Sequence, residues 1–467
     1  MARPTPLSGF PEWLPAGRIV EQHVLDTLRR TFELNGFAGI ETRAVEPLSE
    51  LLRKGETSKE VYVLRRLQAE ADEAAAVDDR SLGLHFDLTV PFARYVLENA
   101  GQLSFPFRRY QIQKVWRGER PQEGRFREFY QADIDVVGAG ELPFHVEVEL
   151  PLVMAEALAA LPIPPVQILV NNRKVAEGFY RGIGLDDVDA VLRSIDKLDK
   201  VGPEVAADFL QQEAGASAEQ ARACLALAGI SGSDARIAEA VTRLAREFGA
   251  TSELLETGLA ELVALVEAAA AVAPGVLVAD LRIARGLDYY TGSVYETVLV
   301  GHESLGSICS GGRYDELATD GANSYPGVGL SIGVSRLVSR LLSAGLVRAT
   351  RSVPSAVVVA VTSEESRTDS ERVAAALRAR GVPVEVAPSA AKFGRQIRFA
   401  DRRGVPFVWF PATAERTQPD GTVVAATEHE VKDIRTGDQV AAELATWVPP
   451  ESDLWPRVVS SGAGSVE

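Results

Sequence analysis

The chain has 467 residues, of which 46% are hydrophobic and 24% are charged, and its formal net charge is −16. This length accommodates roughly two to four domains with their own cores, and the composition is ordinary for a soluble globular protein. The negative net charge excludes a protein that coats nucleic acid through bulk electrostatics, so any polyanionic partner must bind at local basic patches.

Signals for secretion, membrane insertion and disulfide bonding are missing from the sequence. Residues 1–17 contain prolines and no apolar core of a signal peptide. The most apolar window, 258–280, is interrupted by two glutamates and a proline, which favours a buried or amphipathic helix over a membrane span. Cys224 and Cys309 have no metal-ligand neighbours, so we expect no disulfide framework, no zinc site and a reducing, cytoplasmic location.

The N-terminal region predicts a long helix and a short strand. Residues 18–35 place apolar side chains at helical spacing and end before Gly36. A strand then leads to Pro47, and a short helix follows it. This arrangement would suit a dimer interface, although a helix packed in the core of one chain explains the same pattern.

Two polar residues mark the segment LGLHFDLTVPFARYVLENA. Asp87 and Thr89 are two apart in a stretch that we predict to be extended, so they face the same way, and Pro91 opens a helix. Two roles are open for Asp87 and Thr89, which are capping of that helix and binding of a ligand.

Residues 105–138 (FPFRRYQIQKVWRGERPQEGRFREFYQADIDVVG) predict a β-hairpin with one polar face. The period of two places these side chains on that face: Arg109, Gln111, Gln113 and Arg117 in the first arm, and Gln131, Asp133 and Asp135 in the second. A hairpin whose solvated charges pair with each other would show the same pattern. Arginines and carboxylates on one face instead indicate a ligand with both an anionic and a cationic end.

The loop of this hairpin carries Arg120, Arg125 and Arg127 and is too long for a two-residue turn. We expect it to be mobile until an anion orders it. The planar guanidinium group suits this task, because it binds a phosphate through two parallel hydrogen bonds.

The middle of the chain is predominantly helical. A helix is predicted over 141–161, and a buried strand leads into another helix over 164–184. From about 172 to 276 the helical spacing continues with breaks at GISGSD and FGATSE, which predicts a helical insertion. We assign no functional residue to it.

Strand signals resume after the insertion, in VLVADLRIARGLDYYTGSVYETVLVGHESLGSICSGGRYDELATD. The next stretch, PGVGLSIGVSRLVSRLLSAG, predicts a glycine-rich strand that runs into a helix, with Arg336 at the junction. Arg117, Arg285 and Arg336 thus lie at strand or strand-to-helix positions, where a core does not tolerate an unpaired charge. Arginines that bind phosphates and carboxylates that bind an ammonium fit one reaction, the activation of an amino acid by ATP.

The C-terminal region alternates strands and helices from about residue 352, which predicts a mixed sheet of about 100 residues. A hairpin at PDG and a last helix over 437–448 complete this region. The helix over 392–403 is rich in arginine and lysine, which indicates either a nucleic-acid surface or a solvated helix face. Residues 451–467 are expected to be a disordered tail.

These stretches resemble a known family. FRRYQIQKVWRGERPQEGRFREFYQADIDVVG is similar to motif 2 of class II aminoacyl-tRNA synthetases, GVGLSIGVSRL to motif 3, and the run through Pro47 to the dimer-forming motif 1. ARGLDYYTGSVYE and SGGRYDEL resemble the signature stretches of histidyl-tRNA synthetases, and FDLTVPFARY resembles their amino-acid-binding segment. The resemblance runs from about residue 10 to 448.

The resemblance implies an α+β fold. An antiparallel-sheet class II catalytic core would span 1–350 and contain the helical insertion at 172–276, and an α/β anticodon-binding domain would span 352–450. The implied activity is formation of histidyl-adenylate from histidine and ATP, followed by transfer of histidine to the 3′ end of tRNA(His). The implied partners are L-histidine, ATP, tRNA(His) and a second copy in a homodimer, without a membrane. Mg²⁺ would bridge the phosphates, and no protein side chain is assigned as a metal ligand.

The resemblance also implies roles for single residues. Arg117 would contact the α-phosphate and the amino-acid carboxylate, Arg336 the γ-phosphate, and Arg285 the charge that develops on the α-phosphate. These three would be catalytic, and Arg125 would join Arg117 and Arg336 in binding ATP. The implied histidine-binding residues are Asp87, Leu88, Thr89, Arg117, Gln131, Asp135, Arg285, Tyr289 and Tyr290. Within this set Asp87, Thr89 and Gln131 would hold the ammonium group, and Asp135 and the two tyrosines would read the imidazole ring.

For tRNA, the resemblance implies Arg120 and Arg127 near the acceptor stem, and Lys392, Arg395 and Arg398 near the anticodon. The chain departs from the family pattern at Ser335, where a glutamate is usual, and at His85, where an arginine is common. The main alternative is a non-catalytic, synthetase-like protein that senses histidine, and another is a class II synthetase for a different amino acid. The sensing relatives commonly lack the family arginine or the C-terminal domain, and this chain has both.

Overall fold

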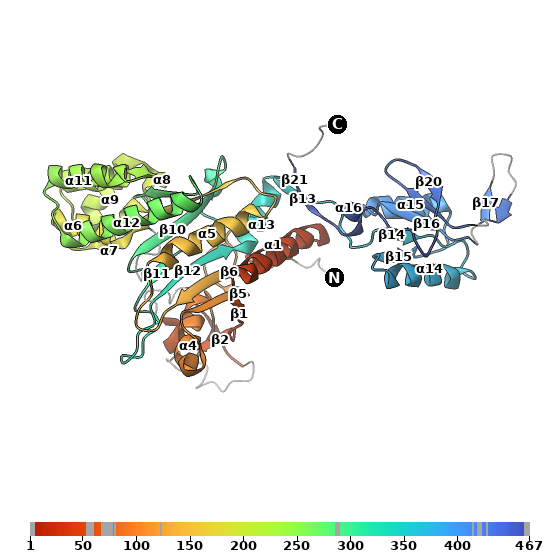
Figure 1. Cartoon of the computed structure of the whole chain (residues 1–467), viewed down its shortest axis with the longest axis horizontal. Coiled ribbons are helices and arrows are strands. Elements are labelled where there is room, and N and C mark those ends of the chain that lie inside the picture. Colours follow the sequence, from red (N-terminus) through yellow and green to blue (C-terminus); the bar gives the residue numbers. More distant parts are fainter. Residues whose placement is uncertain are drawn as a thin grey trace. The chain divides into compact units, whose positions relative to one another are not determined.

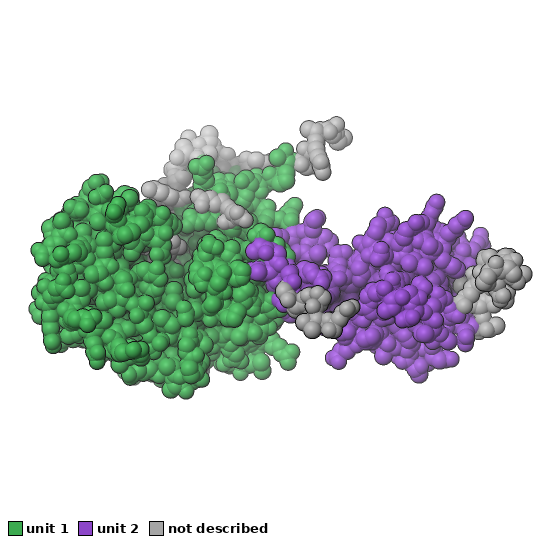
Figure 2. Space-filling model, turned by 90° about the horizontal axis from the view of Figure 1, so that it is seen from above, with its two compact units in different colours: residues 1–12, 24–343 green, residues 13–23, 344–467 purple. Residues whose placement is uncertain are grey.

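A nine-stranded sheet organises the larger part of the protein in a computed structural model. The structure describes residues 5–52, 60–66, 78, 81–121, 124–284, 290–412, 415–417, 423–425 and 428–461, with backbone only at 415–417 and 423–425. These residues form two compact units, one of residues 1–12 and 24–343 and one of residues 13–23 and 344–467 (Figure 2).

The large sheet is antiparallel from its second strand to its seventh, and only its β1–β5 and β7–β9 pairs are parallel. In spatial order its strands are β1 (Ala38–Gly39), β5 (Phe107–Trp116), β6 (Glu128–Val137), β12 (Gly327–Gly333), β11 (Cys309–Tyr314), β10 (Ser293–Leu299), β7 (Val166–Asn172), β9 (Leu277–Asp280) and β8 (Ser231–Gly232). The strands β5 and β6 confirm the predicted hairpin.

Side-chain alternation divides the sheet into an apolar and a polar face. On β6, Ala132, Ile134 and Val136 are at most 1% exposed, and helices α5 (His145–Ala159) and α13 (Val334–Ser343) pack against the sheet (Figure 1). The polar residues of β6 point the other way because successive strand side chains alternate. This leaves the opposite face of the sheet available for a polar site.

A small sheet and two helices precede the β5–β6 hairpin in the sequence. Its strands are β2 (Val45–Pro47), β4 (Leu82–Leu84) and β3 (Tyr62–Leu64), and its helices are α2 (Leu48–Leu51) and α4 (Thr89–Asn99), which η2 (Ala100–Gln102) follows. The predicted strand to Pro47 and the helix after it are confirmed. Helix α4 begins at Thr89, so the prediction that Thr89 lies in extended backbone is wrong, because the helix starts two residues before Pro91.

The predicted helical insertion is confirmed. It contains α6 (Arg173–Gly182), α7 (Val188–Ile195), α8 (Leu198–Val201), α9 (Pro203–Glu213), α10 (Ala218–Ala228), α11 (Arg236–Phe248) and α12 (Glu253–Val272). These helices gather in one group (Figure 1), and α12 contacts β7 and β9 of the large sheet. Glycines set the spacing between α6 and α12: a Cβ at Gly178 would lie 2.4 Å from the Leu255 nitrogen, and one at Gly258 2.7 Å from the Val175 nitrogen. Only residues without a side chain allow the two backbones to approach this closely.

The second unit contains the predicted mixed sheet, which is confirmed. Its order is β15 (Val384–Val386), β14 (Val357–Val359), β16 (Phe407–Phe410), β19 (Glu430–Asp433) and β20 (Gln439–Ala441), with α14 (Arg367–Ala379) and α15 (Phe393–Arg402) in the connections. Strands β17 (Glu415–Thr417) and β18 (Val423–Ala425) form the expected hairpin. The core includes the fully buried Trp409.

Two expectations for the end of the chain are wrong. Residues 437–448 form strand β20 and a turn in place of a helix, because Gly437 adopts φ +88° in the turn and Gln439 pairs with Lys432. The tail expected to be disordered over 451–467 contains α16 (Glu451–Leu454) and β21 (Val458–Ser460), which pairs with β13 (Val347–Ala349), and residues 462–467 lie outside the described residues. Arg435 also binds Asp453 at 2.9 Å.

The long N-terminal helix α1 (Pro15–Leu34) is confirmed and begins three residues before its predicted start. The short helix η3 (Glu303–Leu305) lies between β10 and β11. None of the helices in the described ranges combines the length and the apolar composition that crossing a bilayer requires. The domain boundary near residue 350 stays a prediction, and residues 344–351 group with the second unit.

Candidate active site

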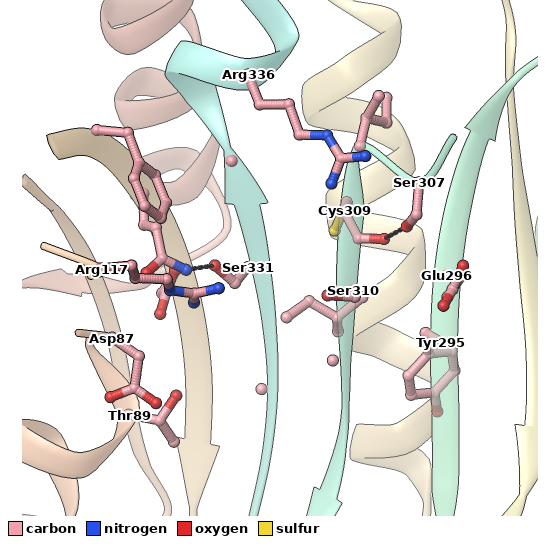
Figure 3. A pocket seen from close by; sticks show the side chains of 18 of the residues that line it. Asp87, Thr89, Arg117, Tyr295, Glu296, Ser307, Cys309, Ser310, Ser331 and Arg336 are labelled. Atoms are coloured by element: carbon pink, nitrogen blue, oxygen red, sulfur yellow. Dashed lines mark hydrogen bonds between the residues drawn. The ribbon is translucent and has the colours of Figure 1, made fainter. Parts of the chain in front are cut away.

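A cavity of about 330 Å³ opens on the polar face of the large sheet. Strands β6, β10, β11 and β12 form its floor, and the turn before α4, the hairpin loop and the start of α13 contribute to its walls. Figure 3 shows Asp87, Thr89 and Arg117 on one side, Glu296 and Ser310 on the other, and Arg336 at the top of the view. These residues come from segments up to about 250 positions apart.

Three cationic side chains line this cavity. Arg117 donates from Nε to the Phe86 carbonyl oxygen at 2.9 Å, and its guanidinium carbon lies 5.3 Å from the Phe129 ring centroid. Arg336, in the first turn of α13, and Arg125 also line the cavity. The third predicted catalytic arginine, Arg285, lies outside the described residues, as do Asp288 and Tyr289. The structure therefore brings Arg117, Arg125 and Arg336 together and leaves the place of Arg285 a prediction.

The turn before α4 contributes a carboxylate that is also a helix cap. Asp87 is 4% exposed, accepts a hydrogen bond from the Val90 N–H at 3.1 Å and lines the cavity beside Thr89. The two roles left open for Asp87 are therefore compatible. Leu88 lines no part of the cavity: its side chain is fully buried, and its carbonyl oxygen accepts from Arg109 at 3.5 Å. The Leu88 side chain packs into the core, and the assignment of Leu88 to histidine binding stays a prediction.

The floor of the cavity contains a buried ion pair. Arg109 lies opposite Asp135 across the β5–β6 ladder and contacts its Oδ2 at 2.7 Å, with side-chain exposures of 0% and 3%. The Tyr314 hydroxyl donates to Asp135 Oδ1 at 2.7 Å, and burial raises the pKa of Tyr314. Gly329 faces Asp135 from β12, and a Cβ there would lie 2.0 Å from that same oxygen. Asp135 is therefore fixed from three sides.

Two further predicted residues line the cavity. The Gln131 amide donates to the Ser331 hydroxyl at 2.7 Å, while its Oε1 has no hydrogen-bond partner among the described residues. Tyr290 lies against β11, where a Cβ at Gly312 would come within 2.8 Å of its ring. An acceptor without a donor beside a cavity is suited to an incoming N–H group.

Several lining residues were not assigned from the sequence. Asp133 is 3% exposed, and burial is the largest of the effects that raise its pKa to about 7, with Arg109 opposing and Asp135 adding to the shift. Tyr314 lies in the quoted signature SGGRYDEL, so the motif could have indicated it. Asp133 lies on the polar face predicted for the hairpin, and only its alternation with Gln131 and Asp135 could have indicated it.

The residues predicted to bind tRNA lie elsewhere. Arg120 is exposed, and Arg127 donates from Nε to the Glu119 carbonyl oxygen at 3.2 Å; neither lines the cavity. Lys392, Arg395 and Arg398 are exposed at the start and along one side of α15. Their tRNA contacts stay predictions.

The two departures from the family pattern have structural roles. Ser335 is buried, and its hydroxyl accepts the Tyr130 N–H at 3.0 Å, which joins the start of α13 to β6. His85 is fully buried, and its Nε2 lies 2.7 Å from the Lys114 carbonyl oxygen. The His85 ring stacks on the Trp116 ring with 5.6 Å between the ring centroids, and burial lowers the pKa of His85. Both residues connect the cavity walls to the hairpin.

The antiparallel sheet with a hairpin arginine, a strand-to-helix arginine and carboxylates around one cavity defines the catalytic domain of a class II aminoacyl-tRNA synthetase. Comparisons with known proteins identify the family more closely. Residues 9–337 match the family model described as histidyl-tRNA synthetase, and residues 355–444 match an anticodon-binding domain. The chain belongs to the histidyl-tRNA synthetase family.

Individual relatives span nearly the whole chain. It is 64% identical to the histidine–tRNA ligase of Micrococcus luteus, over 98% of this chain and 99% of the relative, and 57% identical to that of Cutibacterium acnes, over 99% and 100%. The crystal structure of histidyl-tRNA synthetase from a Nostoc species superposes with a TM-score of 0.80 at 36% identity, covering 95% of this chain and 98% of that one. A second solved structure shares the fold. It is a Bacillus halodurans protein described as ATP phosphoribosyltransferase regulatory subunit/histidyl-tRNA synthetase, and it is 20% identical to this chain with a TM-score of 0.67. The superposition covers 84% of this chain and 96% of that one.

Proposed function

We propose that this chain joins L-histidine to ATP, forming histidyl-adenylate and pyrophosphate, and then transfers the histidyl group to the 3′ end of tRNA(His) with release of AMP. The observation that carries the proposal is one cavity lined both by the arginines Arg117, Arg125 and Arg336 and by the carboxylates Asp87, Asp133 and Asp135. Such a site suits a zwitterionic amino acid beside a polyphosphate. The match of the family model and of full-length relatives favours this activity over the non-catalytic alternative.

The chemistry requires fixed positive charge more than proton transfer. A carboxylate oxygen of histidine attacks the α-phosphorus, a new C–O–P linkage forms, and the bond to the β-phosphate oxygen breaks to release pyrophosphate. Because two anions must approach each other, the protein contributes positioning and charge stabilisation. We assign Arg117 to the α-phosphate and the substrate carboxylate, Arg336 with Arg125 to the outer phosphates, and Arg285 to the charge that develops during attack.

For the amino acid, we assign the ammonium group to Asp87, Thr89 and Gln131, and the imidazole ring to Asp135 and Tyr290 with Tyr289. Support comes from the lining of one cavity by Asp87, Thr89, Gln131, Asp135 and Tyr290. Hydrogen bonding to ring nitrogens gives selectivity, because an analogue without them leaves buried polar groups unpaired.

Mg²⁺ is part of the proposal as a phosphate-bound ion. Among the residues that the structure describes, no group of three His, Cys, Asp or Glu side chains could hold a metal ion. Mg²⁺ keeps several waters and binds through substrate phosphates with one or two carboxylates, so two cavity carboxylates would be enough to hold it. Glu119 and Glu296 line the cavity and are the side chains that we assign to it. When bound, the ion would neutralise phosphate charge.

The assembly and location are also proposed. We infer a homodimer from the long helix α1 followed by strand β2 and Pro47, which match the dimer-forming motif. We infer a cytoplasmic location, with support from Cys224 and Cys309, which are both buried and unpaired.

tRNA is assigned to two regions, the hairpin loop with Arg120 and Arg127, and helix α15 with Lys392, Arg395 and Arg398. Exposed arginines and lysines bind a phosphate backbone with an affinity that falls as salt rises. Residues 355–444 match the anticodon-binding domain model, which supports the second assignment.

Charging of a tRNA(His) transcript with radiolabelled histidine tests the proposal. The wild-type protein is expected to charge the transcript in a reaction that needs ATP and Mg²⁺. Arg285→Ala is expected to abolish activation while histidine affinity stays within a few-fold, and Arg117→Ala to reduce both. Absence of charging by the wild-type protein, with histidine bound normally, would instead support the histidine-sensing alternative.

A further inference from the structure

The carboxylate of Asp133 lines the cavity from β6, and no group of the substrates is assigned to it above. It lies between Gln131 and Asp135 on the same face of β6, and residues two apart on a strand are about 6.7 Å apart. Its side chain is 3% exposed and lines the cavity. A carboxylate at this depth needs either a partner or a ligand.

The neighbours of Asp133 supply little hydrogen bonding. Gln111 is its partner across β5, but the Gln111 amide donates to the Thr42 hydroxyl at 2.9 Å and to Gln113 Oε1 at 2.6 Å. Ser331 is its partner across β12 and gives it one hydrogen bond. Asp133 Oδ1 has no hydrogen-bond partner among the described residues.

Negative charge also exceeds positive charge around Asp133. Asp133 and Asp135 share one buried cation, Arg109, and the guanidinium group of Arg109 contacts Asp135 at 2.7 Å. Tyr314 adds a second bond to Asp135. Asp135 is therefore compensated by the protein, and Asp133 is the carboxylate left for a cationic ligand.

Gln131 and Asp133 both hydrogen-bond to the hydroxyl group of Ser331, and each also has an oxygen without a donor among the described residues. Ser331 accepts from the Gln131 amide and bonds Asp133, while Gln131 Oε1 and Asp133 Oδ1 each have no partner among the described residues. An alkylammonium group offers three N–H donors in a compact cone. An imidazole ring offers its donors in one plane and further apart, so the paired acceptors match the ammonium group better.

We propose that Asp133 is a direct ligand of the α-ammonium group of histidine and adds its negative charge to that of Asp87. This inference rests on the proposed function, and it adds a residue to those assigned to the ammonium group. Gln131 then shares the ammonium with Asp133, and Asp135 with its fixed oxygens is left to the ring.

The inference predicts a linkage between histidine binding and proton release. The charged and titratable groups around Asp133 are Asp135 on β6, Arg109 on β5, Asp87 before α4 and Cys309 on β11, whose thiol pKa burial raises. In the free protein, burial raises the pKa of Asp133 to about 7, so the carboxyl group is partly protonated near neutral pH. An ammonium ion beside it lowers that pKa, so binding expels this proton.

Calorimetric titration of the full-length wild-type protein and Asp133→Asn tests the inference with two ligands, L-histidine and its desamino analogue 3-(imidazol-4-yl)propionate. At pH 8, Asp133→Asn is expected to bind histidine at least about tenfold more weakly, because a hydrogen bond to a charged group is lost. Its affinity for the desamino analogue is expected to stay within about twofold. Near neutral pH the wild-type protein is expected to release more protons on binding histidine than Asp133→Asn does, and protonation of the histidine ring cancels in this difference.

Controls separate a lost ligand from a damaged fold. Asp453→Asn removes a carboxylate of the second unit that pairs with Arg435 and lines no part of the cavity, so both affinities should be unchanged. Asp133→Ser, which removes the charge without adding bulk, should repeat the pattern of Asp133→Asn. Thermal unfolding without ligand should occur at the wild-type temperature or above it in Asp133→Asn, because a buried charge is removed.

Unchanged histidine affinity in Asp133→Asn, an equal loss for both ligands, or equal proton release would overturn the inference. If the wild-type protein binds histidine and the two ligands lose affinity equally, only the role of Asp133 is wrong. If the wild-type protein does not bind histidine, the proposed function is wrong as well.

Discussion

Substitution of Gly329 by alanine tests the geometry of the cavity floor. The new Cβ would lie 2.0 Å from Asp135 Oδ1, whereas ordinary contact begins at 3.4 Å, so the carboxylate must move. It cannot move without lengthening its 2.7 Å contacts with Arg109 and Tyr314. Breaking a buried ion pair costs about 3–5 kcal/mol. We expect Gly329→Ala to lower the unfolding free energy of this sheet by about that amount and to abolish histidine binding.

Hydrogen exchange of the β6 and β12 amides in the full-length protein measures this local free energy. The matched control is Gly101→Ala, because a Cβ at Gly101 meets nothing within 4 Å. If Asp135 causes the loss, the double variant Gly329→Ala/Asp135→Ala should be about as stable as Asp135→Ala alone. Additive losses of about 6–10 kcal/mol in the double variant would refute this reasoning, because the clash would then lie elsewhere.

Three further predictions address other parts of the structure. Tyr314→Phe removes the donor to Asp135 and should cost about 1.5–3 kcal/mol in the same exchange measurement, whereas no change would show that the hydroxyl leaves Asp135 unaffected. Because the pKa of Asp133 is raised to about 7, the folded protein binds more protons than the unfolded chain between about pH 4 and 7, so this group makes stability fall as pH rises through that window. In urea unfolding, Asp133→Asn should lack the part of the fall in stability with pH that is due to Asp133. Parallel profiles of unfolding free energy against pH for the two proteins would contradict this prediction. Replacement of Lys392, Arg395 and Arg398 by glutamate reverses their charge and should weaken tRNA charging at least about tenfold, with pyrophosphate exchange unchanged. The control variant is Arg372→Glu on α14. Equal tRNA charging by the two variants would remove the assignment of α15 to tRNA binding.

Local patterns suffice for much of the fold. The hairpin of β5 and β6 follows from strict alternation of polar and apolar side chains, and the same alternation places Gln131, Asp133 and Asp135 on one face. The insertion follows from helical spacing, and the glycine-rich strand β12 with Arg336 follows from its junction with α13. These features are encoded within roughly 20 residues of sequence.

Features that depend on long-range pairing do not follow from local patterns. The partner of Asp135, Tyr314, lies 179 residues away, so periodicity alone could not show that Asp135 is compensated and Asp133 is left for a ligand. Residues 437–448 have apolar side chains at helical spacing, but pairing of β20 with β19 decides their structure. The tail is polar enough to predict disorder, yet β21 is held by pairing with β13. In each case tertiary contacts override local propensity.

Amino-acid-dependent ATP–pyrophosphate exchange, measured with each of the twenty amino acids at saturating ATP and Mg²⁺, tests the central claim most directly. The proposed cavity, with arginines for phosphates and carboxylates for an imidazole-bearing zwitterion, predicts exchange with histidine far above that with any other amino acid. Exchange driven by a different amino acid, or none above background with histidine, would contradict the account.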